Sequence, residues 1–217
     1  NLPFDVPANQ YVNMPSGAKQ SKSAGTGTWV LNLLDVYAPD ALRFYLLDSF
    51  PTGRDGEFTI EQFVEHCNAH LANKLGNLAS RSHTLVQKYF DGRTPEEWDA
   101  RSFADPAAAE ALAAVLAAAE AAATEVPAAW STMRLNEALE SLWTMIERAN
   151  EFTDRAEPWK SGKDPARRTE LATTLSALLE VLRLAAIWAW PAMPAKCEAL
   201  WSMLGHEGTP ADRRGDD

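Results

Sequence analysis

Apolar side chains recur at intervals of three and four residues along most of the chain beyond residue 39, the pattern of amphipathic helices. Residues 1–30 lack this period and are rich in proline, glycine, serine and asparagine, so we expect irregular structure there with a short strand. The pattern therefore predicts a mainly α-helical protein, with helices over residues 39–48, 60–90, 133–155, 165–190 and 191–204 and an alanine-rich helix that begins at residue 106.

Local chemistry marks where several of these helices begin and end. Thr59 followed by Gln62 is typical of a capping box at the start of the longest helix, which should run to Phe90. Pro106 favours the first turn of the alanine-rich helix, whereas Pro127 should end or kink it because proline has no amide hydrogen. These signals predict helices that pack as a bundle, joined by short connections.

The strongest boundary signal lies between Ser49 and Gly56, where one proline and two glycines interrupt the helical pattern. We therefore expect a small irregular part at residues 1–55, a helical bundle at residues 56–205 and a polar tail without regular structure at residues 206–217.

The composition is that of an ordinary soluble protein, since 217 residues with 46% hydrophobic content suffice for one sizeable core. No apolar run is expected to span a membrane, and the two distant cysteines, Cys67 and Cys197, are expected to pack rather than bind metal. The first residues resemble neither a signal peptide nor a natural start, so we expect a cytoplasmic piece of a longer protein. The net charge of −10 disfavours generic nucleic-acid binding.

The predicted helix at residues 60–90 carries two stripes. One is apolar and should face the core, and an adjacent one is polar. Asn77 and Arg81 on the polar stripe are four residues apart, so their side chains point to one place and could together read the edge of a base. A solvated face is the other interpretation. The apolar stripe comprises Leu71, Leu75, Leu78, Ser82, Leu85 and Tyr89; the polar one comprises His70, Lys74, Asn77, Arg81, Thr84 and Lys88.

Trp159 follows Pro158 just beyond the predicted helix at residues 133–155. Proline stiffens the chain before the indole, which could then serve as a stacking platform for an unstacked base or, alternatively, as a lid on the core. Trp143 and Trp188 lie within apolar helical periods and are expected in the core.

A short loop near the start carries two lysines separated by small polar residues and flanked by glycines, Lys19-Gln20-Ser21-Lys22-Ser23. Movable ammonium groups of this kind can stabilise a developing polyphosphate, although a solvated loop has the same composition.

The order of several motifs along the chain resembles the C-terminal half of a methionyl-tRNA synthetase. The loop is similar to the KMSKS signature of that family, and the resemblance extends from about Leu2 to about Leu204. The other motifs, in order, are Asp35-Val36-Tyr37-Ala38-Pro39-Asp40-Ala41-Leu42-Arg43-Phe44-Tyr45, Asn73-Lys74-Leu75-Gly76-Asn77-Leu78-Ala79-Ser80-Arg81 and Ala156-Glu157-Pro158-Trp159.

The resemblance implies that the parent protein activates methionine with ATP and Mg²⁺ and charges tRNA(Met). Lys19 and Lys22 would stabilise the phosphates as catalytic groups, with Ser21 and Ser23 also at the ATP phosphates, and residues 27–55 would contact the tRNA stem. Residues 56–205 would bind the anticodon through Asn77, Arg81, Pro158 and Trp159. No metal site and no membrane partner are implied for this stretch.

Two departures from the family pattern occur in the loop, since Gln20 replaces a methionine and Ala24 stands where an arginine is common. The first should matter little, and the second removes one positive charge near the phosphates. The H-I-G-H signature and methionine pocket have no counterpart here, so this chain alone should not form methionyl-adenylate. The alternatives are another class I synthetase of the same subclass and a non-enzymatic tRNA-binding helical module.

Overall fold

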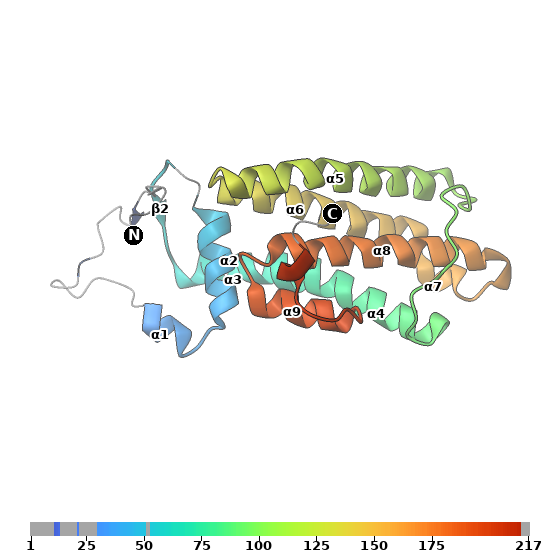
Figure 1. The fold of residues 1–217 in the computed structure, drawn as a ribbon, viewed down its shortest axis with the longest axis horizontal. Helices are drawn as coiled ribbons and strands as arrows, with labels where there is room; N and C mark the ends of the chain where they lie inside the picture. Colours follow the sequence, from blue (N-terminus) through green and yellow to red (C-terminus); the bar gives the residue numbers. More distant parts are fainter. Residues whose placement is uncertain (1–10, 14–20, 22–29, 51–52, 214–217) are drawn as a thin grey trace.

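A computed structural model describes residues 11–13, 21, 30–50 and 53–213 of the chain. These residues form an elongated helical bundle with a small irregular part at one end (Figure 1). The predicted fold class, mainly α-helical, is confirmed.

The small part at one end consists of two short strands and two helices. Strand β1 (Val12–Asn13) pairs in parallel with β2 (Gly56–Glu57), which lies just beyond the predicted domain boundary. Helix α1 is Val30–Leu34 and α2 is Pro39–Ser49. Leu33, Leu42, Tyr45, Phe58 and Phe63 form a separate apolar cluster beneath these elements.

The predicted helix at residues 60–90 is continuous but changes its hydrogen-bond pattern twice. It begins as α3 (Ile60–Cys67), continues as the π-helix η1 (Asn68–Gly76) and ends as α4 (Asn77–Phe90). Thr59 caps the start, because its hydroxyl accepts a hydrogen bond of 3.1 Å from the Gln62 amide. Asp91 then ends the helix in the left-handed region at φ 52°.

The π-helical segment, Asn68–Gly76, interrupts the regular helical period before α4. A fixed turn of ~100° per residue does not hold through it, since π-helical hydrogen bonds span five residues. Leu78, Ser82 and Val86 are the buried residues of α4, whereas Leu71 and Leu85 are half-buried. The predicted apolar stripe therefore faces the core: Leu78 and Ser82 are buried, and its other members are partly buried and pack against core clusters, with Val86 as a further buried residue.

Three long helices complete the bundle: α5 (Pro106–Ser131), α6 (Leu135–Ala156) and α8 (Arg168–Ala189), the last preceded by the 3₁₀ turn η2 (Pro165–Arg167). Helix α9 (Pro194–Met203) packs against α8. Helix α5 continues past Pro127, so of the two expected outcomes, an end or a kink, the end does not occur. Val126 and Ala129 are buried on either side of the proline and hold that turn against α6.

The main core lies between α6 and α8 and includes Leu78 of α4. Trp143 is buried in it as predicted, whereas Trp188 is only partly buried. Contrary to expectation, two helices are long and apolar enough to cross a membrane, Pro106–Ser131 and Pro165–Ala189. Both are side by side with other helices of the bundle, and 67% of the most apolar window of the second is buried inside it.

The C-terminal tail is more ordered than predicted. Residues Pro210–Arg213 form the 3₁₀ turn η3, which packs on α8 and α9. The indole of Trp201 donates a hydrogen bond of 3.1 Å to the carbonyl of Glu207, which ties the start of the tail to the bundle. Gly205 supplies the left-handed residue, φ 84°, that ends α9.

Candidate nucleic-acid interface

Arg81 lies between a carboxylate and an aromatic ring that belong to a different part of the chain. Its Nη2 is 2.9 Å from Oδ1 of Asp154 on α6, and its Cζ is 5.3 Å from the ring centroid of Trp159. The second distance is within the range of a cation–π contact. Of the predicted site residues, the structure thus brings Arg81 and Trp159 together.

Trp159 is held by a short, well-anchored turn. The chain leaves α6 through Glu157, whose φ of 45° turns it sharply into the short helix α7 (Pro158–Ser161). Pro158 and Ser161 are buried, whereas Trp159 between them is half-buried. The indole is therefore presented at the surface from a turn whose two ends are fixed in the bundle.

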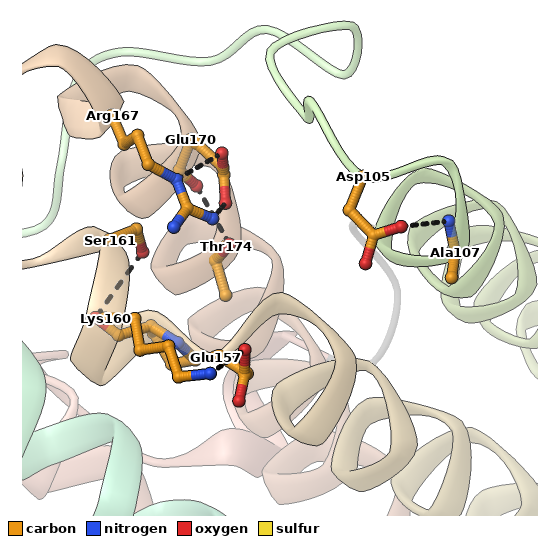
Figure 2. A network of polar contacts seen from close by, with 9 residues as sticks. Asp105, Ala107, Glu157, Lys160, Ser161, Arg167, Glu170 and Thr174 are labelled. Atoms are coloured by element: carbon orange, nitrogen blue, oxygen red, sulfur yellow. Dashed lines mark hydrogen bonds and ion pairs between the residues drawn. The ribbon is translucent and has the colours of Figure 1, made fainter.

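Polar contacts within the turn and at the start of α8 stabilise this region. Lys160 Nζ is 2.7 Å from Glu157 Oε2, and the Ser161 hydroxyl donates to the Pro158 carbonyl (Figure 2). At the start of α8, Arg167 forms a two-pronged ion pair with the buried carboxylate of Glu170, and this hydrogen bonding raises the pKa of Arg167.

The turn after α7 also packs closely on α4. A Cβ atom at Gly162 would lie 2.4 Å from the ring of Tyr89, so a larger residue there would have to displace this ring. Arg168 in turn donates a hydrogen bond of 2.8 Å to the Tyr89 carbonyl. These contacts fix the position of α7, and with it Trp159, relative to the helix that carries Arg81.

Asn77 is exposed at the first turn of α4, one helical turn before Arg81. Two other residues of the predicted polar stripe make contacts of their own. Lys74 pairs with Glu147 of α6 at 2.6 Å, and the Thr84 hydroxyl donates to the carbonyl of Ser80 on its own helix. Arg81 is thus the member of the stripe that contacts Trp159, and Asn77 lies one turn earlier on the exposed surface of α4.

Two acidic residues of α6 at this surface were not predicted. Glu147 and Asp154 are seven residues apart, as are their partners Lys74 and Arg81. The amide of Asn150, between them, donates to the carbonyls of Ile146 and Lys74. Nothing in the helical period of α6 distinguishes these carboxylates from other exposed ones, because the pairing depends on how two distant helices align.

The loop residues Lys19, Lys22 and Ser23 lie outside the described residues. Ser21 is described and is half-buried. The expected phosphate site is therefore a prediction from sequence, whereas the arrangement around Trp159 is described in full.

Comparison with known proteins finds similarity to tRNA synthetases. Residues 1–83 match the family model of class I tRNA synthetases (M). The methionine–tRNA ligase of Thermococcus kodakarensis is 35% identical over 207 residues, which is 95% of this chain and 26% of that protein. The methionine–tRNA ligase of Bacillus subtilis is 37% identical over 204 residues, which is 94% of this chain and 30% of that protein.

A solved structure agrees with these relatives. Mycobacterium tuberculosis methionyl-tRNA synthetase in complex with methionyl-adenylate superposes with a TM-score of 0.82 and 33% sequence identity. The match covers 94% of this chain and 38% of that one. The chain thus spans between a quarter and a third of the length of the two curated relatives, 26% and 30%.

Proposed function

Since the chain is homologous to methionine–tRNA ligases over nearly its whole length, we propose that it is the C-terminal part of such an enzyme and binds the anticodon of tRNA(Met). The observation that carries this proposal is the position of the Arg81 guanidinium, 5.3 Å from the Trp159 ring and paired with Asp154. The complete protein would activate methionine with ATP and Mg²⁺ and transfer it to tRNA in the cytoplasm, without a membrane partner.

Arg81 is well suited to change its partner when a base arrives. Its side chain is 30% exposed and that of Asp154 is 67% exposed, so their ion pair is screened by water and contributes at most ~1 kcal/mol. Breaking this pair costs little, whereas the guanidinium can form several directed hydrogen bonds to a base edge. Asn77, one turn earlier on α4, supplies further donors and an acceptor.

Trp159 supplies the stacking surface. An unstacked base of a single-stranded loop is stabilised when it stacks on an aromatic ring, and any of the four bases can stack in this way. Because Pro158 and Ser161 are buried on either side, the ring needs little ordering when the RNA binds. We therefore assign stacking to Trp159 and base reading to Arg81 and Asn77, with Pro158 as the residue that stiffens the turn.

The acidic character of the chain is compatible with this assignment, because the charges are unevenly placed. Helix α5 carries the exposed residues Glu110, Glu120 and Glu125 and no lysine or arginine. It lies on the opposite long side of the bundle from α4 (Figure 1). Lys163, four residues after Trp159 in the chain, is an exposed cation. Local positive charge is what a phosphate backbone next to the bases requires.

We assign the lysine loop to the activation of methionine with ATP. Lys19 and Lys22 would stabilise the negative charge of the ATP phosphates as the adenylate forms, and Ser21 and Ser23 would donate hydrogen bonds to the same phosphates. Residues 27–55 would connect this loop to the bundle and contact the tRNA stem. Methionine itself would bind to a part of the enzyme that this chain does not include.

Trp159→Ala is expected to weaken the binding of tRNA(Met) by about ten- to a hundredfold, because stacking on one aromatic ring contributes ~1–3 kcal/mol per base. Binding is measured with purified chain and labelled tRNA at fixed salt. Trp98→Ala is the matched control, since Trp98 is also a partly exposed tryptophan, 48% exposed, but lies in the loop between α4 and α5.

The control variant should bind tRNA(Met) as the unchanged chain does. If both tryptophan variants lose affinity equally, or neither does, the assignment of Trp159 is wrong. A Trp159→Ala protein that unfolds at much lower temperature would instead show that the indole serves the core.

A further inference from the structure

Two histidines and an aspartate meet where the small N-terminal part joins the bundle. Asp48 lies in the last turn of α2, His66 in the last turn of α3 and His70 in the π-helical segment η1. One ligand atom from each of the three lies within 4.8 Å of the other two. None of the three residues belongs to the proposed sites for RNA or ATP.

The three side chains are closely packed. His66 Nε2 is 2.5 Å from Asp48 Oδ2, and the rings of His66 and His70 stack with centroids 4.4 Å apart. The side chain of Asp48 is 10% exposed and that of His66 is 26% exposed. Both groups are thus largely removed from bulk water but remain within reach of a small ion.

His70 leaves a polar atom without a partner. Within the described part of the chain, its Nδ1 is buried and makes no hydrogen bond. A buried polar atom without a hydrogen-bond partner destabilises the fold. The centroid of the His70 ring lies 4.9 Å from that of Trp143 and 6.0 Å from that of Phe44, so two aromatic rings adjoin it. Burial, followed by the neighbouring His66, lowers the pKa of His70, so the ring is neutral near pH 7.

We propose that Asp48, His66 and His70 bind a divalent first-row transition-metal ion such as Zn²⁺, which fixes α2 against the long helix at residues 60–90. Imidazole nitrogens and a carboxylate are ordinary ligands of this ion, and three protein ligands leave a fourth position for water. A surface cavity of about 470 Å³ beside the cluster, lined by Tyr45, Ser49 and His66 among others, gives solvent access to that position.

Binding requires only small movements. Around tetrahedral Zn²⁺, with bonds of ~2.0–2.2 Å, neighbouring ligand atoms lie roughly 3.3 Å apart. The ion would take the place of the hydrogen bond between His66 and Asp48, whose two atoms must separate slightly, while His70 moves closer. Cys67 is not a ligand, because its thiol donates to the Ala41 carbonyl at 3.7 Å and burial raises its pKa to about 11.

The proposal is tested by titrating the purified, chelator-treated 217-residue chain with Zn²⁺ in a calorimeter and with Co²⁺ in the visible spectrum. We expect one ion per chain and Co²⁺ absorption of a protein-bound ion. Partners in the outer shell of a metal contribute about 10- to 100-fold in affinity, so Asp48→Asn or His70→Gln should weaken binding at least about 100-fold. His83→Gln, an exposed histidine on α4, is the control and should bind normally.

A second measurement keeps the test independent of how the variants fold. In the unchanged chain, Zn²⁺ should shift the ring nitrogen resonances of His66 and His70 and leave those of His83 and His206 in place. No binding by the unchanged chain, equal binding by the Asp48→Asn variant, or shifts confined to His83 and His206 would each overturn the proposal. The cluster would then be a hydrogen-bonded pair with a stacked neighbour.

Discussion

Leu78→Ala is expected to lower the free energy of unfolding by about 2–5 kcal/mol, the usual cost of truncating a fully buried leucine. Leu78 is 0% exposed and belongs to the main core with Ile146 and Phe152 of α6. Its loss leaves a cavity between α4 and α6, which a close-packed interior fills only in part. The change is measured by urea unfolding followed by the helical circular dichroism signal.

Leu116→Ala is the matched control for this measurement. Leu116 is a leucine within α5 but is 45% exposed, so its truncation should change the free energy of unfolding by no more than about 0.5 kcal/mol. Equal effects at Leu78 and Leu116 would mean that the core face of α4 has been assigned wrongly.

Lys22→Ala should slow the formation of methionyl-adenylate on the order of a hundredfold in the complete ligase of which this chain is proposed to be a part. Removing one directed charge from a transition state costs roughly 3 kcal/mol. Methionine affinity should remain nearly unchanged, because the lysine is assigned to the phosphates and not to the amino acid. Single-turnover kinetics separates the two quantities.

Gln20→Met gives a control within the same loop. It restores the residue that is usual in the family at a position not assigned to the phosphates, so activation should proceed at an unchanged rate. A Lys22→Ala enzyme with a normal single-turnover rate would remove Lys22 from the proposed mechanism.

Helix ends were predictable from sequence because they depend on neighbouring residues. The Thr59 cap and Gly205 at the end of α9 act within a few residues, and the structure contains both. The start of α5 likewise follows from Asp105, whose carboxylate accepts from the Ala107 amide at 2.9 Å.

The π-helical segment was not predictable in the same way. Residues Asn68–Gly76 contain no proline; Gly76 allows the close approach of the Leu71 carbonyl, 2.8 Å from where its Cβ would lie, but a glycine alone does not specify a π-helix. The apolar stripe nevertheless continues beyond it, since Leu85 and Tyr89 pack against the cluster that contains Val86. At Pro127, by contrast, a strong local signal does not end the helix, because the residues around it are buried against α6.

The residues of the candidate sites also depend on contacts between distant parts of the chain, which local sequence does not predict. Asn77, Arg81 and Trp159 were identified mainly through family resemblance, because neither helical spacing nor a proline beside a tryptophan selects them alone. Asp154 was missed, because its pairing joins helices that are distant in sequence. The cluster of Asp48 and the two histidines was missed because residues of α2 and α3 meet only in the folded chain.

The most direct test of the anticodon assignment compares two tRNAs that differ only in the first anticodon base, one bearing CAU and one changed at that base. Each is titrated with the unchanged chain, with Arg81→Ala and with Lys88→Ala, an exposed lysine on the same helix that serves as the control for backbone contacts. A side chain that reads a base edge contributes ~1–3 kcal/mol and its loss relaxes specificity, whereas a phosphate contact affects all sequences alike. We predict that Arg81→Ala narrows the affinity gap between the two tRNAs while Lys88→Ala leaves the gap unchanged; an equal loss of affinity for both tRNAs in Arg81→Ala would contradict base reading by this residue.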